Sequence, residues 1–305
     1  IAYLVANEFS YQKDYDSAVE VYERVRKEVG NDKLFAPTLA AIYGARMDYT
    51  RAIVEYLKQL QDSKPAYQAV EELIRSAREN GMTYRDIERA MSEYLSKEPA
   101  NLNVARLLSD YRYANGDFDG AYKALVPAAV ASKSPADVAL LAERYRQDGH
   151  LEQALRAYED YYRHFEDDPT RVSALIAAGA VREELGDTAG ALELYGRLEA
   201  DYRGSVEGDR AALRRLALSG ELDKPEDRDR KLADFASATA HREVAREAWM
   251  MLASSRLSKG NIPDAKDAFE QAALKSRTND EKYETSVESA WLHFFAGDSE
   301  AMSRE

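Results

Sequence analysis

Apolar residues recur at helical spacing along almost the whole chain, in paired stretches that a short polar turn separates. Residues 104–115 show the spacing of one helix face, Gly116 interrupts it, and residues 119–131 resume it. Two helices joined by so short a turn lie antiparallel, so the pattern predicts a helical hairpin. Glycine ends a helix in the left-handed region without strain, and it stands at the corresponding turn in five units, at Gly116, Gly149, Gly186, Gly260 and Gly297.

An alanine repeats at one position of the second helix. The first two of these alanines, Ala18 and Ala52, lie 34 residues apart, which is the length of a helical-hairpin repeat. One helical turn beyond the alanine stands a large apolar residue in six units: Tyr22, Tyr56, Leu125, Tyr158, Tyr195 and Phe269. We expect the alanine to let two helices approach closely and the large residue to fill the gap to the next hairpin.

This repetition predicts an all-α fold, a right-handed superhelical solenoid of about nine stacked antiparallel hairpins in one domain over residues 1–305. The pattern weakens in residues 70–97 and again in residues 206–240, and the charged linker 220–229 inside the second of these segments is the expected place for a bend. The last unit is incomplete, with Ala301 only four residues behind Gly297. Because the chain opens and closes inside helical patterns, we expect it to be a fragment of a longer protein.

These positions resemble the tetratricopeptide-repeat family, whose repeat sets large apolar, small and aromatic residues at fixed places in two helices. The unit from Arg246 supplies Trp249, Leu252, Ala253, Gly260, Ile262, Ala265 and Phe269. The unit from Lys33 supplies Leu39, Ala40, Tyr43, Tyr49, Ala52 and Tyr56. The units depart from the family repeat at Arg256, Ala36 and Met47. The resemblance covers nearly the whole chain and implies a non-enzymatic scaffold that holds a segment of another protein along a concave groove.

A narrower resemblance begins at Glu193, where the sequence reads ELYGRLEADYRGSVEGDRAALRRLA. It is similar to the bacterial envelope branch of the family, found in outer-membrane assembly lipoproteins. That branch has Tyr-Pro-x-Ser where this chain has Tyr202, Arg203, Gly204 and Ser205. The resemblance implies a bacterial envelope assembly or exopolysaccharide-export system and a periplasmic, outer-membrane-associated location, with a cytoplasmic location left open.

Charge and composition narrow the partners. The chain has 55 acidic and 42 basic residues, a net charge of −13, and no basic stripe set apart from the acidic residues. Because such a chain repels phosphate backbones, we expect no nucleic-acid partner. No stretch reaches the roughly 18 apolar residues of a membrane helix, so we expect no membrane insertion by this chain. The sequence contains no cysteine, which excludes disulfides and thiolate metal sites and leaves the compartment open.

The sequence offers no constellation for catalysis. Its four histidines fall in different units without a second histidine one helical turn away: His150, His164, His241 and His293. The acidic run at residues 166–168 lacks the alternating oxygen ligands of a calcium loop and is better explained as a polar turn. We therefore expect no enzyme activity, no cofactor and no metal.

The family resemblance places the working surface on the first helix of each hairpin, which lines the concave groove. Carried over to this sequence, it implies six contacts with a partner segment: Arg106, Asp110, Tyr113, Glu143, Arg146 and Glu183. The alternative is that several of these side chains only pair with one another across neighbouring first helices. The Lys and Asn pattern with which chaperone-binding members clamp a C-terminal carboxylate is absent, which disfavours a cochaperone role.

Two further function classes remain open. One is an intracellular adaptor or regulatory domain linked to an output module outside this fragment. The other is a helical-repeat protein that acts on or binds glycan, which requires a pocket with convergent polar groups.

Overall fold

A computed structural model describes residues 2–60, 64–219 and 225–296. All regular secondary structure in these residues is helical, which confirms the predicted all-α class. The helices are α1 (Ala2–Tyr11), α2 (Tyr15–Val29), α3 (Ala36–Ala45), α4 (Tyr49–Leu57), α5 (Lys64–Glu79), α6 (Tyr84–Lys97), α7 (Leu102–Ala114), α8 (Phe118–Ala131), α9 (Pro135–Gln147), α10 (Leu151–His164), α11 (Arg171–Glu184), α12 (Thr188–Asp201), α13 (Val206–Ser219), α14 (Pro225–Ala238), α15 (Arg242–Ser258), α16 (Ile262–Lys275) and α17 (Asn279–Ala296). The incomplete last hairpin expected at Gly297 and Ala301 lies outside the described residues.

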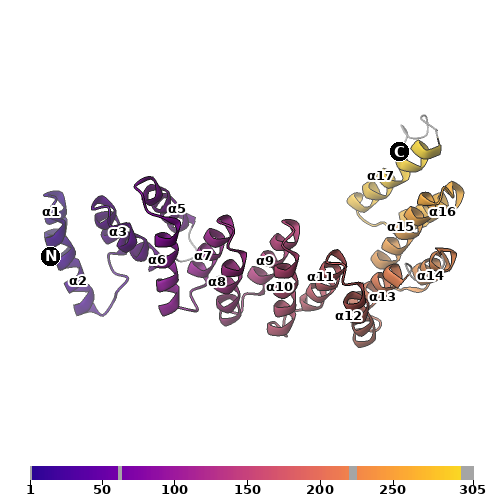
Figure 1. Ribbon diagram of the computed structural model, residues 1–305, viewed down its shortest axis with the longest axis horizontal. Coiled ribbons are helices and arrows are strands. Elements are labelled where there is room, and N and C mark those ends of the chain that lie inside the picture. The colour runs from indigo at the N-terminus through magenta and orange to yellow at the C-terminus, as the bar shows by residue number, and fades with distance from the viewer. Residues whose placement is uncertain (1, 61–63, 220–224, 297–305) are drawn as a thin grey trace. The chain divides into compact units, whose positions relative to one another are not determined.

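Consecutive helices pack as antiparallel hairpins, such as α1 with α2, α3 with α4, α7 with α8, α11 with α12 and α15 with α16 (Figure 1). The turn chemistry explains why each first helix stops and each second helix starts. Gly116 and Gly186 adopt φ of +81° and +77° after α7 and α11. The next residue, Asp117 or Asp187, caps the following helix by accepting a hydrogen bond from the backbone N–H three residues on. Met47, which replaces the glycine before α4, adopts the same left-handed conformation with φ of +57°.

The chain divides into two compact units, residues 1–148 and 149–305, with the boundary in the turn between α9 and α10. Each unit has its own core. The first contains a cluster that runs from α4 through α5 and α6 to α7 and α8, and the second contains one built from α13, α14, α15 and α16. The less regular segments 70–97 and 206–240 thus contribute helices to these cores. A single continuous solenoid over residues 1–305 stays a prediction.

The repeated alanines are fully buried, at 0% exposure: Ala18, Ala52, Ala121, Ala154, Ala191 and Ala265. The large residues one turn further on are buried as well, except for the half-buried Tyr56. Tyr195 shows how tight this packing is, because its ring lies against Gly179 on α11, where a Cβ would fall 2.5 Å from ring atom Cε1. Small residues at these contacts therefore set how closely the two helices of a hairpin approach.

Gly179 and Gly44 make a matched pair for testing this constraint. Gly179 lies in the interior of α11 and Gly44 in the last turn of α3, and alanine is favoured over glycine within a helix by up to about 1 kcal/mol. A Cβ at Gly44 meets only Leu73 Cδ1 at 3.9 Å. We expect Gly44→Ala to stabilise the protein by up to about 1 kcal/mol and Gly179→Ala to destabilise it by about 1–3 kcal/mol, because the Tyr195 ring must move. Urea unfolding followed by circular dichroism measures both, and a stabilised Gly179→Ala variant would show that the contact is not tight.

A buried ion pair joins the first two hairpins. Arg26 on α2 and Glu55 on α4 are 8% and 7% exposed in their side chains and form two hydrogen bonds, at 2.9 and 2.5 Å. Arg26 Nε also donates to the carbonyl of Leu34 at 2.6 Å, and Lys58 Nζ lies 2.8 Å from Glu55 Oε1. Every charge in this cluster is thus hydrogen-bonded.

Removing one partner of this pair leaves the other charge buried. We expect Glu55→Leu to reduce the free energy of unfolding by about 3–5 kcal/mol. The double variant Arg26→Met with Glu55→Leu should lose clearly less free energy of unfolding than Glu55→Leu alone. It leaves no unpaired guanidinium buried, and Lys58 can still reach water. The comparison uses urea unfolding of the wild type, both single variants and the double variant. Additive losses in the double variant would contradict the interpretation.

Candidate functional site

The six residues predicted for the groove fall into both units. Arg106, Asp110 and Tyr113 lie on α7, and Glu143 and Arg146 lie on α9, within the first unit. The remaining residue, Glu183, lies on α11 in the second unit. The candidate site is therefore built from α7 and α9, and Glu183 is considered with its own neighbours.

Arg106 forms a forked ion pair across the two helices. Its Nε and Nη2 donate to the two carboxylate oxygens of Asp137 on α9, at 2.7 and 2.9 Å. The hydroxyl of Ser134 donates to the same carboxylate at 2.6 Å. Burial raises the pKa of Asp137, but the hydrogen bonds from Arg106 and Ser134 outweigh it and hold the pKa below its ordinary value. Asp137 is therefore ionised at neutral pH, and its negative charge balances the positive charge of Arg106.

Asp110 and Tyr113 meet Arg144 of α9 one turn further along. Arg144 Nη1 donates to Asp110 Oδ1 at 2.9 Å, and its guanidinium lies 3.7 Å from the centre of the Tyr113 ring. The Tyr113 hydroxyl donates to Asp148 Oδ2 at 2.5 Å. Burial, together with this carboxylate, raises the pKa of Tyr113 to about 12. With 7% exposure, Tyr113 packs between helices and offers little surface to a partner.

Glu143 and Arg146 lie on α9 itself and are more open. Their side chains are 43% and 38% exposed, with Arg146 Nη1 3.9 Å from Glu143 Oε2. Gln147 Nε2 donates to Glu143 Oε1 at 2.9 Å. These contacts stay within one helix, so they do not tie α9 to α7.

An open hollow of about 300 Å³ lies among these pairs. Its lining residues are Tyr67, Arg106, Ser109, Asp110, Leu125, Asp137, Leu140, Leu141 and Arg144. Leu140 is the notable member, because it is 73% exposed in the middle of a charged surface. The sequence reasoning above did not single out Leu140, Asp137 or Arg144. The sequence does contain a signal for these pairs, because residues of opposite charge recur about one repeat apart. Asp137 follows Arg106 by 31 residues, and Arg144 follows Asp110 by 34.

Residues of opposite charge on successive first helices also pair in the second unit. Glu183 on α11 accepts from Arg214 Nη2 on α13 at 3.3 Å and from the Tyr195 hydroxyl at 2.7 Å. Burial, with Glu183 beside it, raises the pKa of Tyr195. Further pairs join Arg210 to Glu247, at 3.8 Å, and Arg246 to Glu284, at 2.8 Å. Glu183 thus belongs to a network between neighbouring first helices, as the alternative in the sequence analysis proposed for several of the six.

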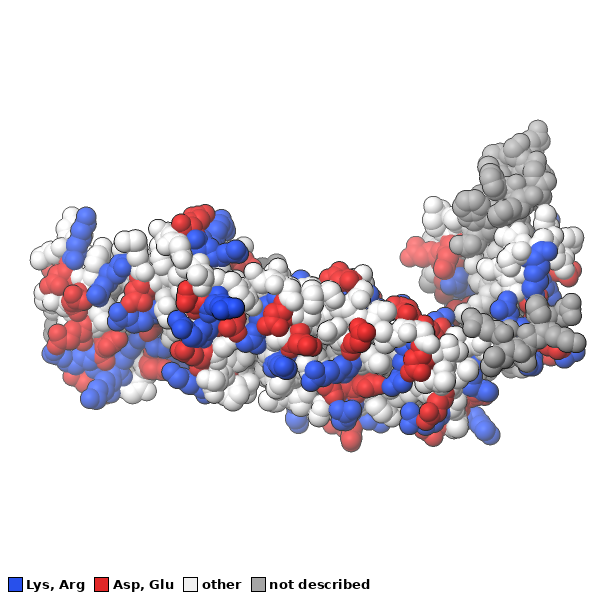
Figure 2. Space-filling view, in the orientation of Figure 1, with Lys and Arg blue, Asp and Glu red and all other residues white. Residues whose placement is uncertain are grey.

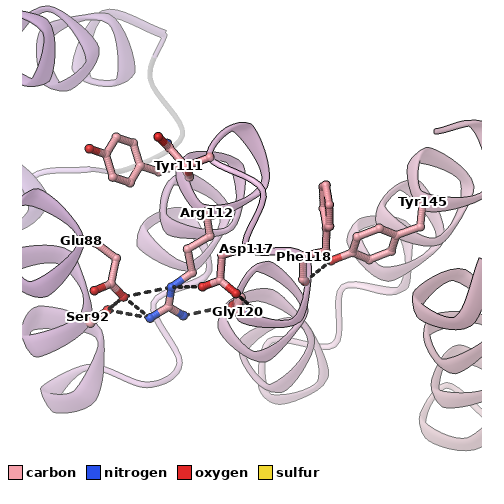
Figure 3. A network of polar contacts seen from close by, with 9 residues as sticks. Glu88, Ser92, Tyr111, Arg112, Asp117, Phe118, Gly120 and Tyr145 are labelled. Carbon is pink, nitrogen blue, oxygen red and sulfur yellow. Dashed lines mark hydrogen bonds and ion pairs between the residues drawn. The ribbon is translucent and has the colours of Figure 1, made fainter. Parts of the chain in front are cut away.

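The other side of α7 is anchored to α6 and α8 by Arg112 (Figure 3). Its guanidinium donates to Glu88, to Ser92 Oγ at 2.9 Å and to the carbonyl of Gly120 at 3.0 Å. Burial raises the pKa of Glu88, but the hydrogen bonds from Arg112 and Ser92 lower it more. This network fixes the helix that carries Arg106 and Asp110.

The described residues contain no group of three or more His, Asp or Glu side chains placed to hold a metal ion. In the same residues, no helix has both the length and the apolar character needed to cross a bilayer. On the face that Figure 2 shows, Lys and Arg side chains alternate with Asp and Glu side chains along the described helices.

Comparison with known proteins finds no matching family model and no significant match among curated proteins. Solved structures similar to this chain include a tetratricopeptide repeat protein from Parabacteroides merdae, with 15% identity, a TM-score of 0.45, and coverage of 81% of this chain and 90% of that one. Yeast Tom70 is similar with 14% identity, a TM-score of 0.41, and coverage of 96% and 62%. The structure of Naa15/Naa10 bound to HypK-THB is similar with 15% identity, a TM-score of 0.43, and coverage of 97% and 46%.

The fold assignment rests on the hairpins of the chain itself. Each described turn between α7 and α8, α11 and α12, and α15 and α16 has a left-handed glycine followed at fixed distance by a buried alanine. These hairpins pack against one another in sequence order within each unit. The chain is an all-α protein with the fold of the tetratricopeptide-repeat proteins.

Proposed function

We propose that this chain is a non-enzymatic, protein-binding scaffold whose α7–α9 face holds a segment of a partner protein. The observation that carries the proposal is Leu140, an apolar side chain exposed beside a hollow of about 300 Å³. Protein interfaces combine an apolar centre with a polar rim, and a few buried anchors supply most of the binding energy. Leu140 has the character of such a centre.

The ion pairs around Leu140 can form the polar rim of such an interface. Arg106 with Asp137 and Asp110 with Arg144 already satisfy one another, so a partner that covers them need not supply the missing charge. Side chains as exposed as Asp110, at 67%, contribute little energy through their pairing. We therefore expect the partner to insert an apolar side chain next to Leu140, with polar groups outside it.

We further propose a bacterial envelope assembly or exopolysaccharide-export system as the setting. The support is the sequence resemblance around Tyr202, Arg203, Gly204 and Ser205. In this chain the segment forms the turn from α12 to α13: Gly204 has φ of +82°, and Ser205 Oγ accepts a hydrogen bond from the Gly208 N–H at 3.0 Å.

A random peptide library displayed on phage tests the α7–α9 face. We expect selection on the wild type to yield at least one group of peptides, rich in apolar residues, whose binding Leu140→Arg weakens about tenfold or more. The reason is that the substitution places a charge where about 2 kcal/mol of apolar burial is expected. Leu274→Arg is the matched control, because Leu274 on α16 is also exposed, at 67%, but lies in the other unit. If every selected peptide binds Leu140→Arg as tightly as the wild type, the proposal for this face fails.

The setting is tested by fractionating cells that express the complete gene in its own host. We expect the protein in the periplasmic or outer-membrane fraction, because the assemblies named by the resemblance work there. Recovery in the cytosol, with a periplasmic marker enzyme retained in its own fraction, would favour the adaptor alternative.

A further inference from the structure

A second open hollow, of about 540 Å³, lies within the second unit between α13, α14, α15 and α17. It is lined by Ala217, Arg228, Leu232, Met250, Met251, Ser254, Ser255, Ser258 and Glu284. Its volume is in the range of roughly 300–1,000 Å³ that is usual for ligand sites. None of the six groove residues lines it, and its role does not depend on the function proposed for the α7–α9 face.

The charges in this hollow are unbalanced. Glu284 is paired with Arg246, whose Nη2 lies 2.8 Å from its carboxylate. Arg228, on α14, makes no ion pair with any residue that the structure describes, and its one hydrogen bond to a side chain goes to Ser255 Oγ, at 2.8 Å. The half-buried guanidinium therefore brings a full positive charge to the hollow without a carboxylate of the described chain to balance it.

The carboxylate of the adjacent residue, Asp229, already has hydrogen-bond partners. Asp229 accepts from Ser255 Oγ at 2.8 Å and from Lys259 Nζ at 2.9 Å. In addition, Arg228 Nε is buried without a hydrogen-bond partner among the described residues. A buried donor left without an acceptor costs about 1–3 kcal/mol, so the described residues do not fully satisfy this guanidinium.

The other residues that line the hollow offer a hydrogen-bond donor for an acidic side chain and an apolar surface for a side chain next to it. Ser254 and Ser258 are exposed on α15. The Ser258 hydroxyl donates to the Ser255 carbonyl at 2.8 Å, so the Ser254 hydroxyl is the one that can donate to an anion. Leu232 and the half-buried Met250 and Met251 form an apolar wall. Methionine is unbranched and adapts to different apolar shapes. The hollow thus combines the Arg228 cation, the Ser254 hydroxyl and an adaptable apolar surface.

We propose that this hollow binds an acidic side chain of a partner segment, next to an apolar one, with Arg228 as the cationic anchor. A guanidinium holds a carboxylate by charge-assisted hydrogen bonds. The site fits a single carboxylate rather than a polyanion, because Arg228 is the one basic residue in the described lining and the chain has a net charge of −13. Nucleic acid and polyphosphate are therefore excluded as its ligand.

The test starts from the full 305-residue chain carrying Leu140→Arg, which disables the α7–α9 face and so separates the two proposals. Selection of a random phage-displayed peptide library on this variant should yield peptides in which Asp or Glu adjoins an apolar residue. One selected peptide and its Asp→Asn (or Glu→Gln) version are then titrated by fluorescence anisotropy. The proteins are this variant and the same variant with Arg228→Gln or Arg228→Lys.

We expect Arg228→Gln to weaken binding of the acidic peptide about tenfold to a hundredfold. The amide version of the peptide should bind the parent protein equally weakly, and Arg228→Gln should bind both peptides alike. Arg228→Lys should keep a preference for the acidic peptide. Circular dichroism melting checks that each variant is folded. Two results overturn the proposal: no acidic enrichment in the selection, or equal loss of both peptides on Arg228→Gln.

Discussion

The close approach of two helices at small buried residues is the constraint on which the rest of this structure depends. Alanine at 0% exposure recurs in the second helix, as at Ala121 and Ala191, and Gly179 lies against the Tyr195 ring with no room for a Cβ. Larger residues there would push the helices of a hairpin apart. The distance between the two helices of a hairpin fixes where the next hairpin packs. It therefore also fixes which side chains of successive first helices face one another.

That spacing explains the polar surface. When first helices lie side by side, residues about one repeat apart become neighbours, and opposite charges at those places pair, as Arg106 with Asp137 and Asp110 with Arg144. Each exposed pair contributes little stability on its own. Their larger effect is that each pair balances its own two charges, so an unpaired charge or an exposed apolar side chain beside such pairs is an informative exception. Leu140 is apolar where its neighbours are charged, and Arg228 is charged where no described carboxylate balances it.

The sequence allows the hairpins to be predicted because their determinants are local. A left-handed glycine, a capping Asp117 and an alanine five residues behind the glycine need no knowledge of the rest of the chain. The candidate site is harder to predict, because each of its contacts depends on how two successive hairpins are positioned against each other. Ion-paired residues on successive first helices are separated by 31 residues for Arg106 and by 34 for Asp110. Tyr113 is predicted as a partner contact, but in the structure its ring packs against Tyr145 and Arg144 and its hydroxyl donates to Asp148, all about one repeat further along the chain.

The two exceptions differ in how they would select a ligand. At the α7–α9 face the charges are satisfied before any partner arrives, so binding there depends on apolar burial and shape, and related apolar segments would compete. At the second hollow Arg228 has no described carboxylate as an ion-pair partner, so a ligand carboxylate gains charge-assisted hydrogen bonds that are stronger than those of a neutral acceptor. A neutral ligand accepts weaker hydrogen bonds from the same guanidinium. Discrimination at this position therefore arises from the difference in hydrogen-bond strength between a charged and a neutral acceptor, whereas discrimination at the α7–α9 face arises from apolar fit.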